Sequence, residues 1–203
     1  MKKSVLFLAL LPFMAVAGFA QESRQDASIS GTALISPQVV GNAVHQTSTI
    51  GQGVLGSYRY MLTPRSALEA NYQYMFRYRV HYHTSFNNQN VETKYQEFSA
   101  AYVFNFNFRR FNPFLEAGIG GFRFSPIQDV GTSNVDAKGS TQIGGLYGGG
   151  IAYELSPSFD IRLEYRGAIM KDPNLVGGPL ASSFNTNRYY NQSNPVIGVA
   201  YHF

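Results

Sequence analysis

The sequence predicts an all-β protein, an eight-stranded antiparallel up-and-down transmembrane β-barrel, on three observations. Apolar and polar residues alternate along several segments, which is the period of a β-strand and not that of a helix. Short turns and long polar loops alternate between these segments, as they do in barrels that cross a membrane. The chain ends on Phe203 within a strand pattern, in which Ile197, Val199 and Tyr201 share the face of Phe203.

Residues 1–20 have the pattern of a secretory signal peptide. A basic start precedes the apolar run 4–14, and a small-x-small cleavage pattern ends at Ala20. The run is too short to cross about 30 Å of hydrocarbon as a helix. We therefore expect cleavage after Ala20, with Ala17 as the competing site, and a barrel formed by residues 21–203.

The composition excludes several classes of protein. The chain has no Cys, so it has no disulfides, no thiolate metal site and no Cys nucleophile. The formal net charge of +4 falls to +2 without Lys2 and Lys3, which gives no reason to expect a nucleic-acid partner. Aromatic residues make up 15% and charged residues 14% of the chain, yet no 18 consecutive apolar residues follow the signal. A closed barrel accounts for both facts, because only every second residue of its strands faces lipid.

The clearest strand is predicted for residues 66–83. Its even positions from Leu68 to Tyr82 are apolar or aromatic, while its odd positions are mostly polar. Such a strand would span about 59 Å, or about 40 Å of height at a 45° tilt, so its outer end should project above the membrane. The segment 93–108 repeats the pattern and is its predicted partner.

The remaining strands are weaker but fall between clear breaks. They are predicted, in chain order, for residues 27–35, 50–62, 113–124, 142–155, 158–170 and 193–203. Tight turns are expected at 63–65, 109–112 and 156–157, and long polar loops at 36–49, 84–92, 125–141 and 171–192. Both ends then lie on the short-turn side, which requires an even number of strands.

The polar faces of these strands predict a charged barrel interior. An eight-stranded barrel is only wide enough for side chains to fill it, and buried charges must be paired. The predicted lumen network contains six acids and six arginines: Arg59, Glu69, Arg77, Arg79, Glu97, Glu116, Arg123, Glu154, Asp160, Arg162, Glu164 and Arg166. Arg123 reaches the lumen only if a bulge at Gly120-Gly121 reverses the alternation. Equal numbers indicate an ion-pair plug and not an open channel.

A soluble, lipocalin-like barrel of similar length is the alternative fold. It would place its apolar face inward around a ligand. The bulk of Tyr and Phe on one face, the Arg, Glu, Asn and Gln on the other, and the terminal Phe203 favour the membrane barrel.

No catalytic, cofactor or metal site is predicted. The segment Gly144–Gly150 lacks the Lys and Ser or Thr of a phosphate-binding loop and lies within a strand pattern. His81 and His83 share a face, with His45 as a third imidazole, but rim histidines are more often plain polar residues than metal ligands.

The terminal strand carries a resemblance to a known family. Gly198, Tyr201 and Phe203 match the assembly signal of bacterial outer-membrane barrels, a Gly followed by two alternating aromatics, although Ile197 stands where that signal has a polar residue. The mature chain as a whole resembles the small eight-stranded outer-membrane β-barrel proteins typified by the OmpA transmembrane domain and OmpX. Nothing follows Phe203, so the peptidoglycan-binding domain of full-length OmpA proteins is not expected.

This resemblance implies a monomer in the cell outer membrane, reached after export to the periplasm. It also implies contact with the barrel-assembly machinery during biogenesis and with outer-membrane lipid and lipopolysaccharide afterwards. Two functions stay open: a structural or surface-contact barrel whose loops bind an extracellular ligand, and a narrow pore for water, ions or small solutes. An enzyme is not expected, because His83-Thr84-Ser85 has the His-x-Ser spacing of lipid A deacylases but is followed by Phe86, with no partnering acid.

Overall fold

The computed structural model describes residues 24–84, 88–127, 136–178 and 184–203. All strands in these ranges belong to one antiparallel sheet with the order β2-β3-β5-β4-β1-β10-β9-β8-β7-β6, closed by pairing of β5 with β6. Their bounds are β1 Gln25–Leu34, β2 Val39–Gly41, β3 Val44–Ser48, β4 Gly51–Thr63, β5 Ser66–His83, β6 Asn88–Asn105, β7 Phe111–Pro126, β8 Ser140–Ser156, β9 Phe159–Lys171 and β10 Tyr189–His202. The predicted signal peptide lies outside the described residues.

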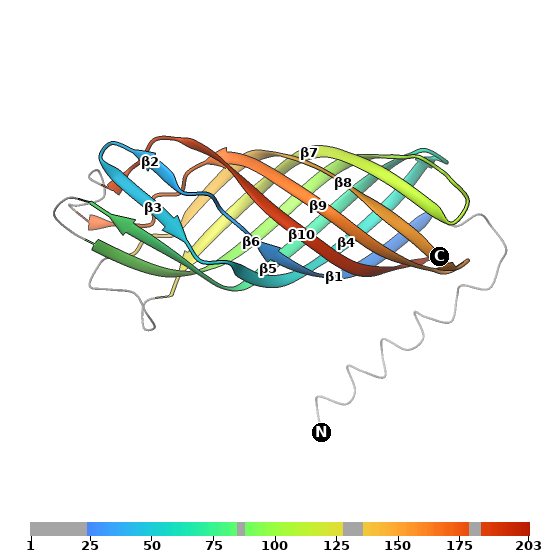
Figure 1. Cartoon of the computed structure of the whole chain (residues 1–203), viewed down its shortest axis with the longest axis horizontal. Coiled ribbons are helices and arrows are strands. Elements are labelled where there is room, and N and C mark those ends of the chain that lie inside the picture. The colour runs from blue at the N-terminus through green and yellow to red at the C-terminus, as the bar shows by residue number, and fades with distance from the viewer. Residues whose placement is uncertain (1–23, 85–87, 128–135, 179–183) are drawn as a thin grey trace, which may run out of the picture.

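Eight of these strands, β1 and β4 to β10, form the closed barrel, and the C-terminal end lies at the end with the short turns (Figure 1). The predicted fold class is therefore confirmed. β1 pairs with β10, so the first and last strands close the wall, with Ala27 opposite Tyr201. Closure satisfies the backbone groups of both terminal strands within the barrel.

In the described part of the chain, no helix is long and apolar enough to cross a membrane.

The loop predicted at 36–49 contains a short hairpin, β2 and β3. Asn42 and Ala43 at its tip have φ values of 49° and 60°, as a type I′ turn requires. β3 pairs with the outer end of β5, from Ser48 opposite Val80 to His45 opposite His83. The hairpin is needed there because β4 begins opposite Arg77 and leaves the outer edge of β5 without a partner.

A β-bulge at Phe76 reverses the faces of β5. Gln52 pairs with Arg77 and the next residue, Gly53, pairs with Met75, so Phe76 is the extra residue. The register with β6 shifts at the same place, between Met75 and Tyr78. The predicted alternation is therefore correct up to Phe76, which faces outward as expected, and wrong from Arg77 onward.

No bulge occurs at Gly120-Gly121. The β6 to β7 register runs without a shift, with Gly120 opposite Ser99 and Gly121 opposite Phe98. Glycine is required for close packing at Gly150 on β8, where a Cβ would lie 2.7 Å from the Phe114 ring and 2.5 Å from the Leu163 carbonyl oxygen.

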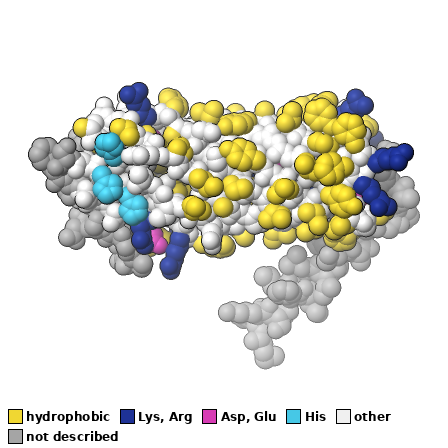
Figure 2. All heavy atoms as spheres, viewed as in Figure 1, with side chains coloured by type: hydrophobic (Ala, Val, Ile, Leu, Met, Phe, Trp, Pro, Cys, Tyr) yellow, Lys and Arg dark blue, Asp and Glu magenta, His cyan; other side chains and the backbone are white. Residues whose placement is uncertain are grey.

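The outer wall carries many apolar side chains, which spread over the middle of the barrel on the face shown in Figure 2 and which we call the apolar belt. Its most exposed members on the strands described so far include Ile29, Ile143, Ile119, Phe98, Ile197, Leu155 and Leu163. On the closing strand, the Tyr201 and Phe203 rings stack at 6.1 Å, and Tyr201 lies 5.1 Å from Phe159. Gly198 faces inward, where a Cβ would collide with the Ser30 side chain.

Candidate functional site

Arg166 on β9 lies among the inward charges in the half of the barrel next to the short turns, and its side chain is fully buried. Its Nη2 lies 2.9 Å from Glu97 Oε1 on β6, and its Nε lies 3.2 Å from Glu116 Oε1 on β7. The same Nε lies 3.3 Å from Glu164 Oε1, two residues back on β9. Three carboxylates thus surround one guanidinium, which links three strands across the lumen.

Further ion pairs lie nearer the short turns. Arg59 and Glu69 are cross-strand partners with an Nη2 to Oε2 distance of 2.6 Å, and the Arg59 guanidinium lies 4.8 Å from the centre of the Phe114 ring. Arg162 Nη2 lies 2.8 Å from Asp26 Oδ2. His202 Nε2 lies 2.8 Å from Asp160 Oδ2. We refer to these pairs and the Arg166 group together as the ionic layer.

The structure places eight of the twelve predicted lumen charges in this layer: Arg59, Glu69, Glu97, Glu116, Asp160, Arg162, Glu164 and Arg166. Glu154 faces inward near the short turns but is only half-buried. Asp26 was missed because the first strand was predicted to begin one residue later, although Asp26 lies directly opposite Arg59.

Arg77, Arg79 and Arg123 were wrongly predicted to face the lumen. The bulge at Phe76 turns Arg77 and Arg79 to the outside, and the absence of a bulge in β7 keeps Arg123 there. Among the described residues, the ionic layer therefore holds six acids, Asp26 included, against three arginines, and the predicted equality of charges is wrong.

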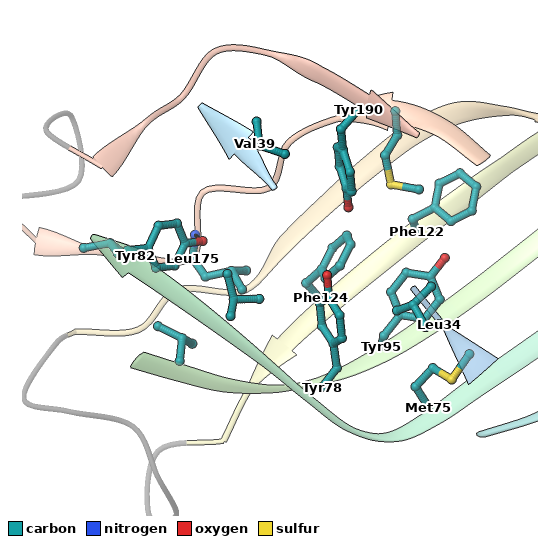
Figure 3. Packing of buried hydrophobic residues seen from close by; sticks show 14 of the residues in the cluster. Leu34, Val39, Met75, Tyr78, Tyr82, Tyr95, Phe122, Phe124, Leu175 and Tyr190 are labelled. Carbon is teal, nitrogen blue, oxygen red and sulfur yellow. Dashed lines mark hydrogen bonds between the residues drawn. The ribbon is translucent and has the colours of Figure 1, made fainter. Parts of the chain in front are cut away.

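The outer part of the barrel interior is apolar and aromatic. Figure 3 shows Tyr78, Tyr95, Phe122 and Phe124 directed toward one another across the lumen. The Tyr95 ring lies 5.1 Å from Phe124, edge to face, and 6.3 Å from Phe122. We call this cluster the aromatic layer; its other buried members are Leu34, Val39, Val44, Met75, Val80, Tyr82, Val91, Ala168, Met170, Leu175, Val176, Phe184 and Tyr190.

The β5 part of the aromatic layer follows from the bulge, because the reversal turns Tyr78, Val80 and Tyr82 inward. Tyr95 and Glu97 are successive inward positions on β6, so the aromatic and ionic layers are in contact. Sequence reasoning missed this layer because Phe76 and Arg77 carry no glycine or other bulge signal.

Beside the charges of the ionic layer lie buried amides without a hydrogen-bond partner among the described residues. Neither side-chain atom of Asn71, Gln73 or Asn194 has one. Gln73 is the cross-strand partner of Glu97, and Asn194 is that of Arg166. Buried polar groups of this kind are normally satisfied by ordered water.

Asp172 links the segment after β9 to the β2–β3 hairpin through hydrogen bonds. Its Oδ1 accepts a hydrogen bond from Gln46 Nε2 at 2.6 Å, and its Oδ2 accepts one from Thr186 Oγ1 at 2.5 Å. The Tyr82 hydroxyl donates to the Pro173 carbonyl at 3.0 Å and accepts from the Leu175 amide at 3.2 Å. Burial raises the pKa of Asp172 to about 6, although the two hydrogen bonds act in the opposite direction. We call the segments that these contacts join the cap.

We expect the cap to be more stable at acidic pH than at neutral pH. The pKa of Asp172 in the folded protein lies above its usual value of about 4. Protonated Asp172 therefore stabilises the cap fully below about pH 4, and this stabilisation is lost as the pH rises through about 6. The difference amounts to up to about 3 kcal/mol. Hydrogen exchange of the amides of Leu175 and Val176, corrected for its intrinsic pH dependence, should therefore be slower at pH 4 than at pH 7.

Asp172→Asn keeps both hydrogen bonds, because its amide nitrogen can donate to the Thr186 hydroxyl. This variant should show the slow exchange at both pH values. Asp136→Asn, which changes an exposed carboxylate, is the control and should keep the wild-type pH dependence. A pH dependence that survives Asp172→Asn would contradict the assignment.

The remaining candidates from the sequence do not form sites in the described residues. Gly144–Gly150 lies within β8. His81 and His83 face outward, with Nδ1 atoms 2.7 Å from Asn90 Oδ1 and 3.1 Å from Asn88 Oδ1. No three His, Cys, Asp or Glu side chains in the described ranges are grouped to hold a metal ion. Ser85 of the His-x-Ser motif lies outside those ranges.

Comparison with solved structures gives the same architecture. The outer membrane protein OprG from Pseudomonas aeruginosa superimposes with a TM-score of 0.58 at 12% identity, covering 90% of this chain and 97% of its own. Neisserial surface protein A gives 0.55 at 16% identity, with 89% and 98% covered. Ail, the attachment invasion locus protein of Yersinia pestis, gives 0.51 at 17% identity, with 89% and 99% covered. At these identities the likeness is one of fold. A search of curated proteins by sequence found no match.

The family model of the outer membrane protein β-barrel domain matches residues 6–203, nearly the whole chain. With the closed barrel, the apolar belt and the short-turn and long-loop ends already described, this match means that the chain belongs to the outer membrane protein β-barrel family and resides in the cell outer membrane.

Proposed function

We propose that the protein is a monomeric, non-enzymatic surface-contact barrel whose lumen is closed. The observation that carries this proposal is the filling of the interior by two different layers, ionic below and aromatic above. Arg166 from β9 and Phe122 and Phe124 from β7 are each fully buried. An eight-stranded wall leaves no additional width for a path around them.

The outer end supports contact with a ligand outside the cell. The β2–β3 hairpin and the segment after β9 are joined by Asp172 and Tyr82 into an ordered cap, and rigid segments are better binding platforms than loose loops. A structure of Ail, which shares the fold, is a complex with a heparin analogue. Lipopolysaccharide around the barrel and the barrel-assembly machinery during biogenesis, with Gly198, Tyr201 and Phe203 as its signal, are further proposed partners.

A narrow pore is the second candidate, and the unsatisfied Asn71, Gln73 and Asn194 favour it. Amides that hold water in mid-barrel would form part of any hydrated path. The excess of buried acids over arginines would make such a path select cations.

Conductance across a planar bilayer distinguishes the two functions. The unmodified protein is expected to give no steady conductance. Removing bulk from one layer only, by Phe122→Ala/Phe124→Ala or by Glu69→Ala/Glu116→Ala/Arg162→Ala, should leave it closed because the other layer remains. Combining the two sets should open a cation-selective path.

Each variant must first show the heat-modifiable gel mobility of a folded barrel, so that the absence of conductance from a misfolded variant is not mistaken for a closed lumen. A stable, well-resolved conductance from the unmodified barrel would overturn the closed lumen and make the pore the better reading.

A further inference from the structure

Beyond the apolar belt on β5, β6 and β7, toward the outer end of the barrel, the outer wall carries basic side chains. On β5 the bulged Phe76 is 55% exposed, and Arg77 comes next. Ile119 on β7 is 70% exposed, and Arg123 is the second outward position beyond it. Phe98 on β6 has the same relation to the exposed Lys94. These are the arginines that the sequence had placed in the lumen, together with a lysine it had not singled out.

The basic residues form one surface, here called the basic girdle: Arg77, Arg79, Lys94 and Arg123. The strands that carry them are neighbours in the sheet. Arg79 is opposite Glu92, and Lys94 is the next outward residue of β6. Arg123 is opposite Gln96, which makes Lys94 and Arg123 diagonal neighbours about 7–8 Å apart at their backbones.

The girdle has more positive charge than its own carboxylate can neutralise. Glu92 is the acid within it, with Oε2 at 3.3 Å from Arg79 Nη2 and Oε1 at 3.7 Å from Arg77 Nε. Lys94 and Arg123 form no ion pair among the described residues. Figure 2 shows basic side chains around an acidic one, next to the histidines and beyond the yellow belt.

A shallow pocket of about 430 Å³ opens beside Arg123 at the outer ends of β7 and β8. Ser125, Ser140 and Thr141 contribute hydroxyl groups to its lining. An arginine beside several hydroxyls suits a phosphate with attached sugar hydroxyls, because the guanidinium pairs with phosphate oxygens while the hydroxyls donate and accept.

We propose that the basic girdle binds the phosphate groups of an anionic glycolipid in the outer leaflet. The girdle lies where the lipid-facing belt ends, which is the level of lipid phosphates, and it faces outward toward neighbouring lipid. Basic residues at this level are attracted to anionic headgroups, and arginine binds phosphate through two parallel hydrogen bonds. The inference rests on the lipid contact of the proposed function, to which it assigns residues, and is independent of whether the lumen conducts.

The full-length mature barrel is refolded in neutral detergent and titrated with bisphosphorylated lipid A, and separately with the same lipid after removal of both phosphates. Bound lipid is counted by native mass spectrometry. The wild type should bind the phosphorylated lipid at least about tenfold more tightly, as expected when charge-assisted hydrogen bonds are made. Lys94→Gln/Arg123→Gln should lose most of this preference. The triple variant Arg77→Gln/Arg79→Gln/Glu92→Gln removes Glu92 together with its two arginine partners, so it leaves no carboxylate unpaired. It should also weaken the preference for the phosphorylated lipid.

Lys171→Gln/Arg188→Gln is the matched control, because it removes two cations from the same end of the barrel but over β9 and β10. It should retain the wild-type preference. Equal binding of both lipids, full retention by Lys94→Gln/Arg123→Gln, or an equal loss in the control would each overturn the site. Binding of soluble heparin without any preference for the phosphorylated lipid would overturn the glycolipid as its ligand.

Discussion

Replacing Arg166 by Met is expected to lower the free energy of unfolding by about 3–5 kcal/mol, the largest loss foreseen for a single side chain in this barrel. The reason is the surroundings of the guanidinium. Glu97, Glu116 and Glu164 all depend on it for a positive partner within 3.3 Å, and it is completely buried. Its removal leaves three buried carboxylates facing one another without this cation. Urea unfolding in detergent micelles, followed by circular dichroism or by the gel-mobility shift, measures the change.

Arg123→Met is the matched control for this prediction. The two arginines have the same chemistry and both were predicted for the lumen, but Arg123 faces outward and is exposed. An exposed arginine without an ion pair should change stability by no more than about 0.5 kcal/mol. Similar losses in the two variants would show that the face assignment of β7 or β9 is wrong.

Much of the barrel could be predicted because long stretches of its strands keep one unbroken period. From Glu69 to Met75, and along β7, β9 and β10, alternate residues face lipid and lumen as their polarity requires. The polarity is strong because the outer face must be apolar and the inner face of the ionic layer must be paired. Glu69 opposite Arg59 and Asn194 opposite Arg166 follow directly from such registers.

The bulge at Phe76 could not be predicted, because both faces of β5 around it accept either orientation. Tyr78 and Tyr82 suit a lipid belt as well as a buried layer, and Arg77 and Arg79 suit a paired lumen as well as a headgroup surface. Only the neighbouring strands decide. Gln52 and Gly53 are consecutive on β4, whereas their partners on β5, Arg77 and Met75, are separated by Phe76. The Tyr95, Phe122 and Phe124 side chains provide the apolar surroundings for Tyr78.

The same reversal explains the different composition of the two halves of the interior. Below Phe76 the inward positions of β5 are Glu69, Asn71 and Gln73, and above it they are Tyr78, Val80 and Tyr82. Since an alternating strand exchanges its faces at a bulge, one extra residue turns Tyr78, Val80 and Tyr82 into the aromatic layer and Arg77 and Arg79 into the basic girdle. The β5 residues of the proposed closed lumen and of the proposed glycolipid surface therefore have a common structural origin.

Replacing Leu163 by Arg is expected to cost about 2–4 kcal/mol, because a charge on the lipid face is most unfavourable near the middle of the bilayer. Leu163 is 58% exposed on the outer wall of β9 and is opposite Ile197 and Ile151, so apolar residues surround it on both neighbouring strands. Unfolding of the protein from phospholipid vesicles by urea measures the cost.

Leu62→Arg introduces the same side chain on the same face but beside the turn at 63–65, where Leu62 is 50% exposed. Near the interface the expected cost falls to about 0–1 kcal/mol, because the guanidinium can reach water and headgroups. The difference between the two variants thus depends on depth and not on the chemistry of the substitution. Equal costs would mean that the belt around Leu163 does not face the hydrocarbon, and a negligible cost at Leu163 would mean that the inner and outer faces of β9 are reversed.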